Sequence, residues 1–173
     1  ARMPAEGERY QNPKGIHAGD YADSSAQDNL LWASAELYRT TGRQAYGEAY
    51  RRGAKDLKVD VTSNVSFKDQ GLAALWAYLM TADSSSDPVL YQQARGAFLA
   101  AADWRMREGE AHPFRAPTHH AIQWAGWGSF GRSTAATLPL LQAYHLTGKD
   151  SYRDWAWLTP NPQLGANPQG ISY

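Results

Sequence analysis

The chain has 173 residues, of which 43% are hydrophobic and 12% aromatic, a composition typical of a globular protein with a packed core. Basic and acidic residues both number 17, and this balance argues against a nucleic acid or an anionic membrane surface as the partner. The sequence contains no cysteine, so disulfides and thiolate chemistry are excluded.

The first predicted pair of helices follows Ser25. This serine is the expected cap of a helix in which apolar residues recur every three to four positions, and Gly42 is its expected end. The spacing of Tyr46, Ala49 and Tyr50 predicts a second helix over residues 44–57.

The second predicted pair begins with helical spacing in residues 72–79. Asp87 followed by Pro88 places a cap and a first-turn proline at the start of a long helix, which is expected to reach residue 106. Residues 108–132, which are rich in glycine and proline, are expected to form a loop.

The last pair is expected over residues 133–146 and 150–158, with a kink at Pro139. The turns inside the pairs share a motif, Tyr-x-x-Thr-Gly-basic-x-x-Tyr, which occurs in residues 37–46 and 143–152 and begins again at Tyr78. Repeated helical hairpins bury their faces against one another, so the sequence predicts an all-α fold, either a solenoid or a closed toroid.

Two of the seven tryptophans, Trp124 and Trp127, fall in the predicted loop, where an aromatic side chain often faces a cleft. An indole ring can stack on the C–H face of a sugar, and His119 and His120 can donate or accept hydrogen bonds at the rim. We therefore predict sugar binding here. The other five tryptophans are expected in the core or in hairpin contacts: Trp32, Trp76, Trp104, Trp155 and Trp157.

The segment HAGDYADSSAQD gathers Asp20, Asp23 and Asp28 among small residues. These carboxylates admit three interpretations, namely a turn with a helix cap, a catalytic group, or a hard-cation site built from oxygen ligands. The sequence alone leaves the choice open.

Four segments occur in an order that resembles the C-terminal half of the catalytic domain of family 9 glycoside hydrolases, the cellulase family. They are GDYADSSAQDNLLWASAELYRTTG, WGSFGRS, LLQAYHLTGKDSY and QLGANPQGISY. The resemblance implies that residues 1–173 form a single domain or fragment, part of an (α/α)6 toroid built from helical hairpins. It also implies hydrolysis with inversion, in which one carboxylate activates water and a carboxylic acid protonates the leaving oxygen.

The resemblance places the catalytic acid on a glutamate beyond the NPxGxSY segment, and no glutamate follows Glu110 in this sequence. Asp20 and Asp23 are the candidate carboxylates of this chain. HAGDY is similar to the DAGD motif that carries the family's catalytic base, but the helix that follows it resembles a later family segment, which argues against Asp20 as the base.

The resemblance implies that Trp127 stacks on a substrate sugar. Members of the family often continue as WGSLRY, whereas this chain has Phe130-Gly131-Arg132, so the arginine contact, here from Arg132, is expected to be shifted or lost. Some family members bind calcium at the start of the equivalent helix, and Ser24, Asp28 and Asp69 fall at matching positions. Ser25 and Asn29 depart from that pattern. Calcium is thus an optional ion and no cofactor is required; the alternative role of Asp28 is a helix cap.

The predicted function is endo-acting hydrolysis of β-1,4-glucans. Alternatives are an exo-β-glucosaminidase of the same family, a non-catalytic helical-repeat scaffold, and another α/α toroid enzyme such as a polysaccharide lyase or terpenoid cyclase. The expected partners are a β-glucan or glucosamine oligosaccharide and either the remainder of the toroid or a second copy, with no nucleic acid and no membrane. The expected localisation is secreted or periplasmic.

Overall fold

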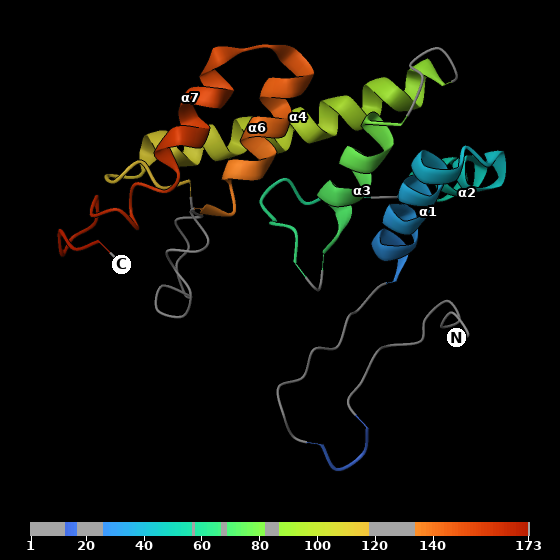
Figure 1. Ribbon diagram of the computed structural model, residues 1–173, viewed down its shortest axis with the longest axis horizontal. Coiled ribbons are helices and arrows are strands. Elements are labelled where there is room, and N and C mark those ends of the chain that lie inside the picture. The colour runs from blue at the N-terminus through green and yellow to red at the C-terminus, as the bar shows by residue number, and fades with distance from the viewer. Residues whose placement is uncertain are drawn as a thin grey trace. The chain divides into compact units, whose positions relative to one another are not determined.

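The computed structural model describes residues 13–16, 26–56, 58–66, 69–81, 87–117 and 134–172. All regular elements in these ranges are helices, which confirms the all-α prediction (Figure 1). They are α1 (Gln27–Thr41), α2 (Gln44–Ala54), α3 (Gly71–Leu79), α4 (Pro88–Ala111), α6 (Thr137–Thr147) and α7 (Asp150–Leu158).

Helix α4 begins where the sequence predicts and continues further than predicted. The carboxylate of Asp87 accepts the backbone N–H of Leu90 at 3.1 Å, which confirms the cap ahead of Pro88. The helix continues to Ala111, so the prediction of a loop from Glu108 is wrong for its first turn.

Two other predictions need correction at helix ends. Helix α2 ends at Ala54, three residues before the predicted end. Helix α6 begins at Thr137, so Pro139 lies in its first turn, where proline is tolerated, and not in the interior that the predicted kink assumes.

The repeated turn motif forms the same structure in both complete copies. Gly42 and Gly148 adopt left-handed φ angles of 66° and 68°, which a residue with a Cβ adopts at a cost. Their N–H groups close the preceding helices on the carbonyls of Tyr38 and Tyr144 at 2.8 and 2.7 Å. The threonine before each glycine donates its hydroxyl to the carbonyl four residues back, at 2.7 Å in both turns.

The contacts divide the chain into two compact units. Unit 1 comprises Ala1–Val59 and Val65–Ala94, and unit 2 comprises Asp60–Asn64 and Arg95–Tyr173. In unit 1, α1 packs against both α2 and α3. The rings of Tyr50 and Tyr78 stack in this core with centroids 4.3 Å apart.

In unit 2, α6 and α7 form a hairpin, and each of them bonds to the part of α4 that belongs to this unit, which starts at Arg95. Trp155 of α7 lies directly on Gly109, where a Cβ would come within 2.4 Å of the indole ring. The Tyr152 hydroxyl donates to Asp103 at 2.6 Å, and Arg95 donates to the carbonyl of Leu146 at 3.4 Å. These contacts fix the register of α7 along α4.

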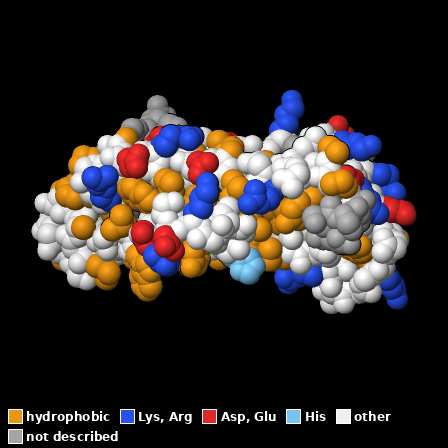
Figure 2. All heavy atoms as spheres, turned by 90° about the horizontal axis from the view of Figure 1, so that it is seen from above, with side chains coloured by type: hydrophobic (Ala, Val, Ile, Leu, Met, Phe, Trp, Pro, Cys, Tyr) orange, Lys and Arg blue, Asp and Glu red, His pale blue; other side chains and the backbone are white. Residues whose placement is uncertain are grey.

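Several large hydrophobic side chains reach the surface between charged ones (Figure 2). Trp157 is 73% exposed and Trp32 is 38% exposed, so the prediction that they belong to the core or to hairpin contacts is wrong for Trp157 and only partly met by Trp32. Among the described residues, no helix has the length and apolar character to cross a membrane.

Candidate functional site

Most of the predicted site residues lie outside the described residues. These are Asp20, Asp23 and Ser24, which precede α1 in the sequence, and His119, His120, Trp124, Trp127 and Arg132, which fall in the predicted loop. Their predicted roles therefore stay predictions. The structure does place Asp28 and Asp69. It also places the residues up to Pro117 that lead into the predicted aromatic loop.

Asp28 and Asp69 come together at the N-terminus of α3. The Asp28 carboxylate accepts the backbone N–H of Gln70 at 2.6 Å, across 42 residues of sequence. The Asp69 carboxylate accepts the next N–H, that of Gly71, at 2.8 Å. Two successive unpaired donors of the helix are thus satisfied by carboxylates, which also complement the positive end of its dipole.

This arrangement revises the predicted cap. Helix α1 has Ala26 at its N-cap position and no side-chain cap bond there, so Asp28 does not cap its own helix. It serves as a remote cap for α3 instead. A sequence pattern cannot show this contact, because it joins residues that only the tertiary fold brings together.

The carboxylate oxygens of Asp28 and Asp69, which were predicted as calcium ligands, act as hydrogen-bond acceptors in this structure. Both described carboxylates already accept N–H groups at a helix N-terminus, where the dipole opposes a cation. Within the described part of the chain, no three acidic or histidine side chains gather as metal ligands. Asp28 and Asp69 by themselves therefore fit a capping role better than a metal site, and the predicted ligand Ser24 lies outside the described residues.

The segment that leads into the aromatic loop is fixed to unit 2. Arg115 adopts a left-handed φ of 56°, and its guanidinium lies over the ring of Trp155 with its carbon 6.0 Å from the centroid. Ala116 and Pro117 follow and are buried. The predicted sugar-binding loop therefore starts from a packed base.

Arg105 is a buried charged residue that organises unit 2 and that the sequence motifs did not point out. It is fully buried in unit 2, and its two terminal nitrogens donate to four oxygens: the carbonyls of Val61, Ala101 and Ser63 at 3.2, 2.8 and 2.5 Å and the Asn64 side chain at 2.9 Å. Because three of these acceptors belong to residues 60–64, the arginine clips that segment to α4.

Burial lowers the pKa of Arg105 to about 10, an effect that the negative charge of Asp60 partly opposes. The side chain stays charged at neutral pH and is held by carbonyl dipoles with no carboxylate bonded to it among the described residues. The sequence does carry a sign of this, since Arg105 continues the apolar spacing of Phe98 and Ala101 on one helix face.

The segment from Asn161 to Ser172 is closed by one buried side chain. The Asn167 amide donates to the carbonyls of Pro162 and Ile171 at 2.7 and 2.8 Å, and its oxygen accepts the Gln169 N–H at 3.0 Å. An antiparallel bridge between Leu164 and Ser172 completes the ring. Residues 161–172 thus form a closed loop with exposed Leu164 and Ile171.

Comparison with known proteins identifies the wider group. The sequence model of the family described as glycosyl hydrolase family 9 matches residues 3–173. Endoglucanase D of Acetivibrio thermocellus is 24% identical over 95% of this chain and 26% of its own length. A xyloglucan-specific endo-beta-1,4-glucanase of Bacteroides ovatus is 27% identical over 91% of this chain and 27% of its own length.

Solved structures agree on the fold. A single-mutant thermostable endoglucanase from Alicyclobacillus acidocaldarius superimposes with a TM-score of 0.81 at 28% identity, covering 96% of this chain and 31% of that one. Such structures are (α/α)6 toroids, so the helical hairpins are confirmed as part of this fold. The chain spans about a quarter of the length of the relatives it matches.

Proposed function

The chain belongs to glycosyl hydrolase family 9, and from this premise we propose that it is part of an enzyme that hydrolyses β-1,4-glycosidic bonds in cellulose-like glucans. The family match carries the proposal. It is supported by relatives named as an endoglucanase, a xyloglucan-specific endoglucanase and a cellulose 1,4-beta-cellobiosidase. We favour endo action with inversion of the anomeric centre.

Inversion needs two carboxyl groups far enough apart to admit a water molecule between the base and the sugar. The general acid is assigned to a glutamate outside this chain, because no glutamate follows Glu110. This chain would then supply helices and loops of the cleft rather than the catalytic pair, and Asp20 and Asp23 remain its only candidates for a carboxylate role.

Substrate binding is assigned to the aromatic loop. Trp127 and Trp124 would stack on glucosyl rings, while His119, His120 and Arg132 would bond to hydroxyl groups. The buried base at Ala116 and Pro117 supports this assignment, because a fixed starting point lowers the conformational entropy lost when a loop closes on a ligand.

The remaining roles belong to the same proposal. A secreted or periplasmic location suits a polymeric substrate, and the exposed apolar side chains of α1 and α6 suit contact with further helices of the toroid or with a second copy. Calcium stays an optional ion, with Ser24, Asp28 and Asp69 as its proposed ligands.

Tryptophan fluorescence tests the sugar-binding role. Cello-oligosaccharides should change the emission of the full chain, and Trp127→Ala should remove most of that change. Trp157→Ala is the matched control, since it deletes a 73% exposed indole from a helix outside the loop. An equal response in the wild type and the Trp127 variant would contradict the assignment.

Activity assays distinguish the alternatives. Release of reducing ends from carboxymethyl-cellulose by the full-length enzyme supports the endoglucanase, whereas release from chitosan oligomers alone supports the exo-β-glucosaminidase. Binding of neither substrate with an intact fold would favour the helical scaffold. Asp20→Asn and Asp23→Asn should retain most activity; a loss of several orders of magnitude in either variant would move the catalytic base into this chain.

A further inference from the structure

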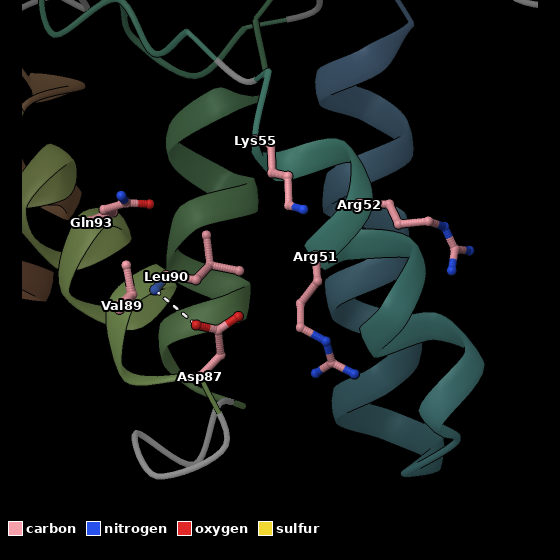
Figure 3. Close-up of a pocket in the computed structure, with 7 residues that line it drawn as sticks. All are labelled: Arg51, Arg52, Lys55, Asp87, Val89, Leu90 and Gln93. Atoms are coloured by element: carbon pink, nitrogen blue, oxygen red, sulfur yellow. Dashed lines mark hydrogen bonds between the residues drawn. The ribbon is translucent and has the colours of Figure 1, made fainter.

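A pocket of about 350 Å³ lies within unit 1, between the C-terminal turn of α2 and the first turn of α4 (Figure 3). The pocket is lined by residues at the end of one helix and the start of the other: Arg51 and Arg52 of α2, Lys55 just after it, and Asp87, Val89, Leu90 and Gln93. The volume is at the small end of the range for ligand pockets, enough for one ring-sized molecule. Neither the proposed hydrolysis nor the proposed calcium site uses these residues.

Two of the three cations that line this pocket, Arg51 and Lys55, have no partner among the described residues. Arg51 is half-buried and Lys55 exposed, and neither makes a described ion pair or side-chain hydrogen bond. Figure 3 shows both side chains directed toward the gap that separates α2 from Asp87 and Leu90. The neighbouring Arg52, in contrast, points away and pairs with Glu48 at 3.8 Å.

Helix stability does not require this convergence. Basic residues in a last turn complement the helix dipole whichever way they point, for roughly 0.3–1 kcal/mol each. Arg51 and Lys55 are four residues apart on one face, where like charges repel. A half-buried guanidinium without an acceptor adds to that cost. An anion between the two side chains would relieve both penalties.

The opposite wall offers acceptors and an apolar surface. One oxygen of Asp87 accepts the Leu90 N–H, which leaves its second oxygen available to a donor. The exposed amide of Gln93 can donate or accept, and Val89 and Leu90 provide apolar contact.

The hydroxyl of Tyr78 interacts electrostatically with Asp87 and Arg51, one residue from each side of the pocket. It is buried and has no hydrogen-bond partner among the described residues. Burial raises the pKa of Tyr78, the carboxylate of Asp87 raises it further, and Arg51 opposes them. Tyr78 does not line the pocket, but residues from both of its sides act on the pKa of this hydroxyl.

We propose that this pocket binds a hydroxylated anion, specifically a sugar ring that carries a carboxylate. The fork of Arg51 matches a carboxylate in a bidentate manner, with Lys55 as a second positive charge. The hydroxyl groups of the ring donate to Asp87 and bond to Gln93, while its C–H face lies on Val89 and Leu90. A simple anion would gain the same contacts with Arg51 and Lys55. It has no hydroxyl group to donate to Asp87, however, so its repulsion by that carboxylate would stay uncompensated.

Calorimetric titration of the full chain with glucuronate tests the proposal. We expect millimolar affinity, at least tenfold weaker binding by Arg51→Ala and by Lys55→Ala, and intermediate binding by Arg51→Lys, which keeps the charge but loses the fork. Arg43→Ala, at an exposed arginine that precedes the same helix, removes the same charge outside the pocket and should leave the affinity unchanged. Glucose and acetate should each bind at least tenfold more weakly than glucuronate.

Two results would overturn the proposal. One is equal weakening by Arg43→Ala and Arg51→Ala, which would indicate attraction by net charge alone. The other is no detectable heat with glucuronate in the wild type at low salt. Chemical-shift changes of the Lys55 and Leu90 amides locate the binding, so affinity for glucuronate at a distant cleft, with these amides unmoved, would also count against it.

Discussion

The α1–α2 and α6–α7 hairpins turn in the same way and then pack by different means. Tyr38 and Tyr144 occupy equivalent places before the two turns. The ring of Tyr38 covers Gly47, where a Cβ would lie 3.3 Å from it, whereas Tyr144 faces the guanidinium of Arg153 at 5.6 Å. Glycine and arginine therefore hold the same position in the repeat, one as a surface for a ring and the other as a cation over it.

The second helices of the two hairpins also bury different aromatic residues. Helix α2 buries Tyr50 against Tyr78, with both hydroxyls unbonded among the described residues, whereas α7 buries Tyr152, whose hydroxyl is bonded to Asp103. The difference shows that a local motif sets the turn and that contacts made beyond it set the packing. Six substitutions and two controls test this division.

Gly109→Ala should have the largest effect, because it acts on packing. A Cβ at this position would be 2.4 Å from the ring of Trp155, so α7 must move, and we expect a loss of about 3 kcal/mol in the free energy of unfolding. Gly96→Ala is the control on the same helix, since nothing lies within 4 Å of its Cβ position, and it should be neutral or stabilising. Urea denaturation measures both.

Tyr152→Phe should come next, at about 2 kcal/mol, because it removes a bond to a carboxylate. Tyr46→Phe, at the equivalent position of α2, should cost less than about 0.5 kcal/mol. Equal losses would show that the two hairpins pack alike after all.

The same variant carries a pH signature. Burial and the Asp103 hydrogen bond raise the pKa of Tyr152 to about 12. Since ionisation is disfavoured in the folded state, this stabilisation is complete below the unfolded pKa near 10 and is lost as the pH rises through about 12. The difference in unfolding free energy between wild type and Tyr152→Phe should therefore shrink across this interval, and a constant difference would contradict the assignment.

Gly42→Ala and Gly148→Ala should each cost about 1–2 kcal/mol, because both glycines have left-handed φ angles. The shared turn predicts that the two losses agree with each other. A difference above about 1 kcal/mol would mean that the packing, and not the turn, decides the cost.

Gly47→Ala and Arg153→Ala should have the smallest effects, each below about 1 kcal/mol. The first asks the Tyr38 ring to shift by a few tenths of an ångström, and the second removes a cation–π contact that is open to solvent. High salt should weaken only the second effect. Thermal melts at two salt concentrations separate them.

Much of the fold could be predicted because its signals are local. The cap of Asp87, the stop at Gly42 and the start of α7 each depend on a few neighbouring residues, and the structure agrees with all three. The predicted loop from Glu108 and the placement of Trp157 were wrong, because helix length and burial depend on what packs alongside.

The candidate site was less accessible to sequence reasoning. The bond from Gln70 to Asp28 spans 42 residues, and the clip by Arg105 spans a similar distance. Neither has a spacing rule, since each exists only after the helices have packed. The sugar-binding residues rest on the family resemblance, and fluorescence of the Trp127 variant is their direct test.

The Arg105 clip also bears on the order in which this chain acquires its structure during synthesis. Asn64 leaves the ribosome 41 residues ahead of the arginine that holds it, which at roughly 5–20 residues per second is a delay of about 2–8 s. Residues 60–64 thus belong to a unit whose other residues have not yet been made. Through that interval their carbonyl groups are hydrated, and they exchange water for a guanidinium only when α4 has emerged.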